Sequence, residues 1–298
     1  MSRIPDNRTI VLINLPGSHD STAYNMFCLG SCFAKTQDLD ITSQLNIGVR
    51  LFDIRVTKRS NLFESDIIND IICCHGICDC YHTEKNRKVN LTYEHVLEEI
   101  KLFLQKNPSE TVIIKTKSGR GNKSLNLQFA SEIFDNILGD ISVEYNDKCT
   151  LGQLRGKVIN VFDKYNSIEG TDIISIHEKY TNGNSNFNEF KVNGDLKVRE
   201  IMELMEKYYY KIDEAENFMK LPLNYETSCT GEFTKIIPLP RYEANIVNKF
   251  LREYEFRRGY YYGWISADFI DELITKKIIE SNFSEDDNII NDLSGDSL

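Results

Sequence analysis

Short apolar segments that alternate with amphipathic helical stretches predict an α/β fold, a single distorted (β/α)8 barrel of parallel strands. The segments recur through a chain of 298 residues, a length that suits one large barrel. Most are apolar on both faces, as expected for strands buried in a parallel sheet. The expected strands are Ile10–Leu15, Val49–Val56, Ile71–Cys74, Thr111–Lys117, Val158–Phe162, Ile173–Ile176, Leu221–Tyr225 and Gly263–Asp268.

The clearest helix begins after Thr92. Its apolar residues recur at helical spacing, and Pro108 follows shortly after the expected end. Further helices are expected at Leu125–Leu138, Val198–Tyr209, Tyr242–Phe256 and Asp271–Glu280. No second domain is indicated, so residues 1–298 are expected to form one barrel, with a core over residues 10–282 and a flexible acidic tail over residues 284–298.

The composition narrows the possible partners. The net charge is −10, which argues against nucleic-acid binding because that function needs a basic surface. No segment approaches the roughly 20 apolar residues of a membrane span. The first residues lack the apolar stretch of a secretory signal, so we expect a cytoplasmic or peripheral membrane protein, with secretion left open.

Four cysteines crowd around a histidine in Cys73-Cys74-His75-Gly76-Ile77-Cys78-Asp79-Cys80. A cluster of this density could hold zinc, although its spacing matches no usual pair of CxxC motifs. The other interpretation is a set of free thiols around a buried strand end, which a reducing compartment would favour.

Polar and charged residues gather where the expected strands end. In a parallel barrel these ends share one rim, where active sites lie. The residues at or just beyond the strand ends are His19, Asp53, Arg55, His75, Lys117, Lys164, Glu178, Tyr180 and Asp268.

Two histidines and an arginine on one rim are suited to acid–base attack on a phosphate ester. A neutral imidazole has a pKa of about 6.5 and can accept a proton near neutral pH. A second, protonated imidazole can donate one. The planar guanidinium of Arg55 matches phosphate oxygens and stabilises their growing charge.

The order of these motifs resembles one known family. The segments Leu15–Ser21, Gly48–Arg55, His75-Gly76 and Asn107–Thr111 are similar to the X domain of phosphatidylinositol-specific phospholipase C, of the bacterial, metal-independent type. Leu151–Lys157 and Gly263–Phe269 continue the resemblance, which extends from about Ile10 to Asn282.

The resemblance implies a two-step reaction. The inositol 2-hydroxyl would attack phosphorus and release diacylglycerol and inositol 1,2-cyclic phosphate, which is then slowly hydrolysed. His19 would be the general base, oriented by Asp268, and His75 the general acid, hydrogen-bonded to Asp20. Arg55 would bind the nonbridging oxygens.

The resemblance also addresses the metal. Eukaryotic members carry a calcium-binding carboxylate where this chain has Arg55, and a calcium-binding asparagine where it has Asp20. Because arginine repels a cation, we expect neither a metal nor any other cofactor.

The expected substrate is phosphatidylinositol or a related inositol lipid at a membrane surface, met by a monomer. By resemblance the substrate-binding residues are Asp53, Lys117, Lys164, Glu178 and Tyr180. Glu178 stands where bacterial members have aspartate, and Lys164 is the nearest cation to the place of a family arginine. Candidates for membrane contact are Tyr24, Met26, Phe27 and Phe33, and a later loop with Phe233, Ile236, Ile237 and Leu239.

Other interpretations remain. A catalytically inactive inositol-lipid-binding module would share the rim. A glycerophosphodiester phosphodiesterase would also use a barrel and two histidines, but it needs a Glu-x-Asp metal site where this chain has Asp53-Ile54-Arg55. Asp268 could instead cap the helix that follows, and Lys115 is a rival to Lys117.

Overall fold

The computed structural model describes residues 1–27, 34–59, 70–146, 148–162, 194–207, 209–212, 224–226 and 240–284. At its centre lies a curved, parallel sheet. Its strands, in spatial order, are β10 (Asn224–Glu226), β11 (Trp264–Ala267), β1 (Leu15–Ser18), β3 (Leu51–Lys58), β7 (Val112–Ser118), β9 (Val158–Phe162) and β8 (Ser142–Glu144). Within the described part of the chain, no hydrogen bonds join β10 to β8 to close the sheet. The predicted α/β class and distorted barrel are confirmed.

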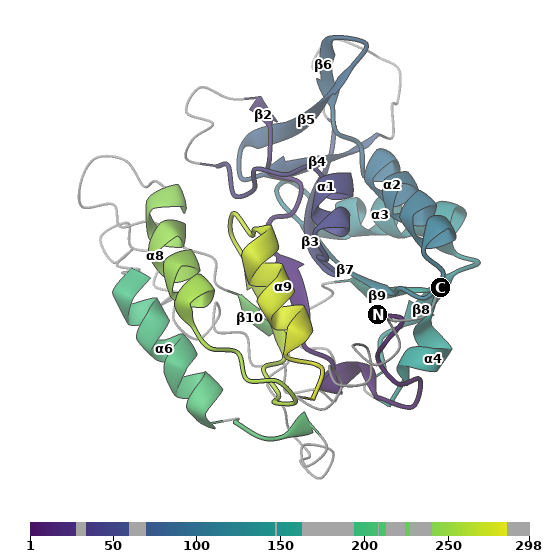
Figure 1. The fold of residues 1–298 in the computed structure, drawn as a ribbon. Coiled ribbons are helices and arrows are strands. Elements are labelled where there is room, and N and C mark those ends of the chain that lie inside the picture. Colours follow the sequence, from purple (N-terminus) through teal and green to yellow (C-terminus); the bar gives the residue numbers. More distant parts are fainter. Residues whose placement is uncertain are drawn as a thin grey trace, which may run out of the picture.

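A smaller antiparallel sheet rises from the carboxyl end of β3 (Figure 1). It contains β4 (Ile71–His75), β5 (Cys78–Glu84), β6 (Arg87–Asn90) and β2 (Met26–Phe27). β4 runs antiparallel to β3, with Val56 opposite Cys73. The prediction that residues 71–74 form a parallel barrel strand is therefore wrong, because this segment pairs with β3 as the return of a hairpin.

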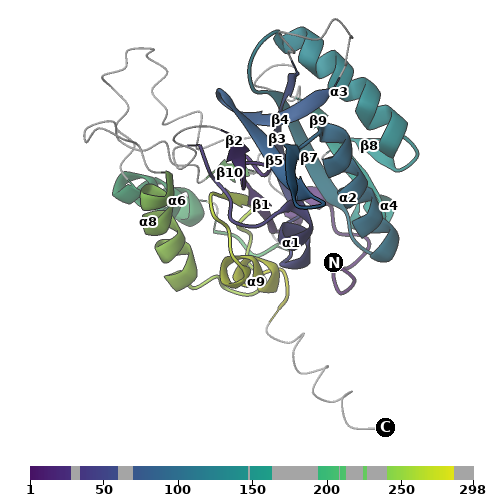
Figure 2. The same ribbon diagram turned by 90° about the horizontal axis from the view of Figure 1, so that it is seen from above.

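Helices lie around the parallel sheet. Seen from above, α2 and α3 lie together on one side, and α6 and α8 lie together on the other (Figure 2). The helices are α1 (Ile41–Asn46), α2 (Tyr93–Lys106), α3 (Lys123–Leu138), α4 (Leu151–Leu154), α6 (Gly194–Lys207), α8 (Pro240–Glu253) and α9 (Glu272–Glu280). All the expected helices are present, with ends that differ by a few residues. No helix of the described chain combines the length and apolar character needed to cross a bilayer.

The first expected strand and the one at residues 221–225 differ from the observed strands. Ile10–Leu12 forms a 3₁₀ helix, η1, and the strand begins only at Leu15. The expected strand at 221–225 overlaps β10 only at its end, and the one at 173–176 lies outside the described residues, as does the tail from residue 285. The short strand β8 was not predicted, since three partly exposed residues carry little periodic signal.

Helix α2 shows how sequence and packing agree. Thr92 caps it, its side chain accepting a hydrogen bond from the His95 amide. Val96, Leu97 and Ile100 are buried against the sheet and α3, whereas Leu102 faces solvent at 55 % exposure. The helix therefore buries one apolar stripe.

Buried Asn14 joins the start of β1 to the end of the chain's core. Its Nδ2 donates to the Tyr260 carbonyl and to Ser281 Oγ, both at 2.8 Å. Its Oδ1 accepts from the amides of Tyr262 and Gly263 at 2.7 and 2.9 Å. Because this amide ends the apolar run before β1, it also explains why the strand starts late.

Close packing of β1 against its neighbours requires Gly17. A Cβ at this position would lie 2.5 Å from Ser266 Oγ on β11 and 3.0 Å from Leu51 Cβ on β3. The absence of a side chain therefore allows β1 to fit between the two strands.

We expect Asn14→Ala to lower the free energy of unfolding by about 2–4 kcal/mol, because it leaves several buried polar groups without partners. Urea denaturation would measure the loss. The matched control is Asn146→Ala, which removes an exposed side chain that bonds only to a neighbouring amide. A loss below about 1 kcal/mol for Asn14→Ala would contradict the assigned role.

Candidate active site

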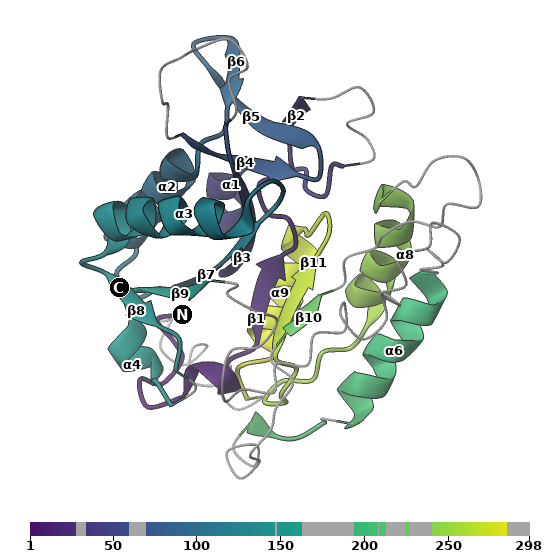
Figure 3. The same cartoon turned by 180° about the vertical axis from the view of Figure 1, so that it is seen from behind.

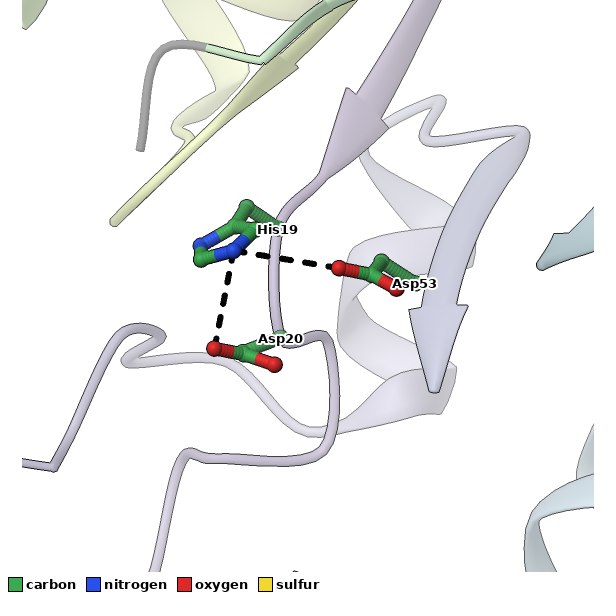
Figure 4. Close-up of side chains that lie close together, drawn as sticks. All are labelled: His19, Asp20 and Asp53. Carbon is green, nitrogen blue, oxygen red and sulfur yellow. Dashed lines mark ion pairs between the residues drawn. The ribbon is translucent and has the colours of Figure 1, made fainter. Parts of the chain in front are cut away.

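The register of three parallel strands brings the site together. Ser18, the last residue of β1, lies opposite Ala267 of β11 and Phe52 of β3. The next residues along the three strands are His19, Asp268 and Asp53, and the His19 ring lies against both carboxylates. Figure 3 shows the three strands side by side, and Figure 4 shows His19 beside Asp53. The edge is fixed by Ser21, whose amide donates to the Asp53 carbonyl and whose Oγ accepts from the Asp53 amide, both at 2.8 Å.

His19 has different partners at its two ring nitrogens. Its Nδ1 lies 2.8 Å from Asp268 Oδ1, an acceptor, so Nδ1 carries the proton. Its Nε2 lies 2.9 Å from Arg55 Nη2, a donor, so Nε2 presents its lone pair. This arrangement sets the tautomer of the neutral ring, with the lone pair of Nε2 directed at Arg55.

Burial and neighbouring charged side chains shift the pKa of His19. Burial by itself would lower the pKa of His19, but the carboxylates of Asp20 and Asp268 outweigh it and hold the pKa above the ordinary 6.5. The Arg55 guanidinium acts in the opposite direction and lowers the pKa. His19 is thus a stronger base than a free imidazole.

Asp20 lies between the two imidazoles. Its Oδ2 is 3.6 Å from His19 Nε2 and 3.2 Å from His75 Nε2, and its Oδ1 forms an ion pair with Arg55 Nε. The backbone of Asp20 has a φ of 41°, in the left-handed region. This turn, directly after β1, lets the adjacent side chains of His19 and Asp20 face the same site.

His75, at the end of β4, faces acceptors at both nitrogens. Its Nδ1 donates to the Ala34 carbonyl at 2.6 Å, and its Nε2 faces Asp20. The Ala34 carbonyl fixes a proton on Nδ1, so Nε2 is the nitrogen directed into the site. The two rings therefore have different partners: the Arg55 guanidinium donates to His19 Nε2, whereas His75 Nε2 faces the Asp20 carboxylate.

A cation and a carboxylate complete the rim. Lys117 Nζ lies 3.4 Å from both carboxylate oxygens of Asp53, and Asp53 Oδ2 lies 3.8 Å from His19 Nε2. Arg55 and Lys117 lie opposite each other on β3 and β7. The site thus presents two cationic side chains beside the base.

His19, Asp20 and Asp53 are the only group of potential ligands among the described residues that is compact enough to hold a metal ion (Figure 4). The Arg55 guanidinium contacts His19 and Asp20, and Lys117 contacts Asp53. These positive charges oppose a divalent cation at the same place.

The cysteine cluster forms no comparable group. Cys73, Cys74 and Cys80 are free and buried, and Cys78 is disulfide-bonded. Burial raises the pKa of Cys74 to about 11 and also raises the pKa of Cys73 and of Cys80. Buried thiols that resist deprotonation are poor zinc ligands, so the thiol interpretation holds for three of the four.

The structure therefore brings His19, Asp20, Asp53, Arg55, His75, Lys117 and Asp268 to one rim, whereas Lys164, Glu178 and Tyr180 lie outside the described residues. The helix cap considered for Asp268 is instead Asp271, which accepts from the Ile274 amide. Trp264 is buried in β11, as are Tyr24 and Met26 near β2, whereas Phe27 is 41 % exposed.

Two supporting contacts carried no sequence signal. One is the Ala34 carbonyl, which accepts a hydrogen bond from His75 Nδ1. The other is Gln37, whose Nε2 donates to the carbonyls of His19 and Ala267 at 2.8 and 2.9 Å and so ties β1 to β11 at the rim. Both act through positions far from the strands in sequence.

Known proteins resemble this chain in sequence. The family model "Phosphatidylinositol-specific phospholipase C, X domain" matches residues 13–164, just over half of the chain. A 1-phosphatidylinositol phosphodiesterase of Staphylococcus aureus (strain Newman) is 28 % identical over 74 % of this chain and 68 % of its own. One from Listeria monocytogenes is 26 % identical over 95 % of this chain and 84 % of its own.

Solved structures agree on the fold. Phosphatidylinositol-specific phospholipase C from Listeria monocytogenes matches with a TM-score of 0.68 and 24 % identity, covering 95 % of this chain and 97 % of that one. A Staphylococcus aureus counterpart, studied for modulation of its membrane binding, matches with a TM-score of 0.66 and 19 % identity, covering 95 % and 96 %.

A barrel with paired imidazole and carboxylate groups and a guanidinium at its rim is typical of enzymes that cleave phosphodiesters. More specifically, the chain belongs to the phosphatidylinositol-specific phospholipase C X-domain family.

We expect Asp268→Asn to lower the pKa of His19, because it removes a carboxylate that raises it. His19 would then lose its proton at lower pH than in the wild type. NMR titration of the His19 ring protons in both proteins would measure the change. An unchanged or raised pKa would contradict the assigned pairing, and Asp271→Asn, at the helix cap, is a control that alters a different carboxylate.

Proposed function

We propose that this protein cleaves phosphatidylinositol into diacylglycerol and inositol 1,2-cyclic phosphate by imidazole acid–base catalysis. Membership of the phospholipase family and the names of its bacterial relatives support the reaction. The observation that carries the mechanism is the placement of two imidazoles on either side of Asp20: His19 Nε2 accepts from Arg55, and His75 donates from Nδ1 to the Ala34 carbonyl and directs Nε2 at Asp20.

In the first step, His19 Nε2 takes the proton of the inositol 2-hydroxyl, and that oxygen forms a bond to phosphorus. The bond from phosphorus to the glycerol oxygen breaks, and His75 Nε2 gives its proton to that oxygen. Because the nucleophile belongs to the substrate, no second reactant has to be positioned. Asp268 holds the His19 ring in the required tautomer.

In the second step the roles reverse. His75, now neutral, takes a proton from water, which attacks the cyclic phosphate. The bond from phosphorus to the 2-oxygen breaks, and His19, now protonated, gives its proton to that oxygen, so both rings return to their starting states. Throughout, the Arg55 fork binds the nonbridging oxygens and stabilises the charge that grows on them.

The inositol ring would lie beside Asp53 and Lys117. Lys117 offers an ammonium donor and Asp53 a carboxylate acceptor, so together they can bind neighbouring ring hydroxyls. Lys164, Glu178 and Tyr180 are expected to complete this pocket by resemblance to the family.

The reaction would need no metal ion. Arg55 supplies, beside His19 and Asp20, the positive charge that a divalent cation would bring to the phosphate. The protein would act as a monomer at a membrane surface, and it needs no other cofactor.

The decisive experiment is product analysis with vesicles that contain phosphatidylinositol. We expect inositol 1,2-cyclic phosphate to appear before inositol 1-phosphate, at the same rate with and without a calcium chelator. Loss of the product with chelator would overturn the metal-free mechanism. Vesicle binding without any turnover would instead favour an inactive lipid-binding module.

We expect His19→Ala and His75→Ala each to lower kcat/KM by about 10²- to 10⁴-fold, the usual contribution of a general base or acid. His95→Ala is the matched control, since His95 lies on α2 and contacts Glu99 and His82 away from the rim. Steady-state rates on phosphatidylinositol would measure the effects. A loss below about tenfold in either variant would contradict its assigned role.

A further inference from the structure

The hairpin that carries His75 ends in the most exposed large apolar side chain of the described chain. Ile77 is 90 % exposed, at the turn between β4 and β5. His75 and Cys78 pair across the turn, which leaves only Gly76 and Ile77 between the strands. Gly76 has a φ of 56°, a conformation that suits such two-residue turns. Ile77 is thus held outward two residues from the proposed general acid.

Arg120, in the segment between β7 and α3, holds this turn in place. Arg120, just after β7, donates from Nη1 to the Gly76 carbonyl at 3.2 Å and from Nη2 to Asp79. A charge-assisted contact on each side of Ile77 fixes the backbone that presents it. The exposed isoleucine is therefore part of an ordered structure.

The outward face of β5 continues from Ile77 with an acidic residue paired with Arg120 and then an aromatic residue. Alternation along the strand buries Cys78 and Cys80 and turns Asp79 and Tyr81 outward. Phe27 of β2, 41 % exposed, lies on Tyr81 with ring centroids 4.5 Å apart. Lys88 of β6 sits over the same Tyr81 ring, 4.7 Å from its centroid.

We propose that this face, formed by Ile77, Phe27, Tyr81 and Lys88 and called here the hairpin face, contacts the phospholipid bilayer during catalysis. An exposed aliphatic tip, a pair of aromatic rings in contact and a flanking cation match the composition that favours a lipid–water interface. The inference rests on the proposed function, because that function places the scissile lipid in a membrane.

Position identifies the lipid side of the site. The small sheet that bears the hairpin face rises above the carboxyl ends of the barrel strands (Figures 1 and 3). In the proposed mechanism His75 protonates the departing diacylglycerol, so the acyl chains leave on the His75 side. Ile77 lies on that side, and Lys88 offers a positive charge to neighbouring lipid phosphates.

Tryptophan substitution tests insertion directly. The chain has one tryptophan, Trp264, which is buried and gives a constant background. We expect Ile77→Trp to shift its emission to shorter wavelength on adding vesicles of phosphatidylcholine and phosphatidylglycerol, which contain no substrate. Leu102→Trp, on the outer face of α2 at 55 % exposure, should show no shift. Equal responses from the two variants would overturn the proposal.

Charge substitution tests the consequence. We expect Ile77→Asp to partition onto the same vesicles at least about tenfold more weakly than the wild type, because a buried isoleucine contributes roughly that much or more. Its cleavage of phosphatidylinositol in vesicles should fall accordingly, while cleavage of a short-chain phosphatidylinositol dissolved as monomers stays within about twofold. Leu102→Asp should leave both unchanged.

The outcomes separate the two ideas. If the wild type cleaves neither form of the lipid, the proposed function fails, and vesicle partition and fluorescence still judge the hairpin face. If it cleaves both and Ile77→Asp binds vesicles as tightly as Leu102→Asp, the hairpin face is wrong and the function stands. An unchanged unfolding temperature for Ile77→Asp would show that the loss is not a folding defect.

Discussion

The parallel register of β1 between β11 and β3 is the constraint on which the rest of the structure depends. Pairing of Ser18 with Ala267 and with Phe52 aligns the residues that follow them, His19, Asp268 and Asp53. A shift of one residue in either pairing would turn a side chain to the opposite face of the sheet. Gly17 permits the close approach, and Asn14 fixes the starting point of β1.

The hydrogen-bond and ion-pair partners of the two imidazoles differ, and this difference underlies their proposed roles as base and acid. His19 receives a hydrogen bond from Arg55 at Nε2, and His75 donates to a carbonyl and faces a carboxylate. Asp20 contacts both rings and Arg55, so it balances the cationic charge of the site. Arg55 therefore contacts His19 and Asp20 in the free protein, and its guanidinium is placed to bind an anionic substrate.

The sequence predicted what local pattern can encode. Amphipathic spacing located α2, and the ends of apolar runs identified His19, Arg55 and Asp268. It did not reveal the direction of β4, because the same apolar residues suit a parallel or an antiparallel partner, and only pairing with β3 decides between them. Nor could it reveal the Ala34 carbonyl or the left-handed backbone of Asp20, since neither depends on a characteristic side-chain pattern.

The attachment of β4 to the far end of β3 has a consequence for how variation is tolerated. The barrel supplies His19, but His75 stands on an accessory ribbon joined to it through three residue pairs, Val56–Cys73, Thr57–Ile72 and Lys58–Ile71. The distance between the two imidazoles therefore depends on the pairing of β3 with β4, where the two sheets join. A substitution that shifts this pairing would move His75 relative to His19 although it alters neither imidazole.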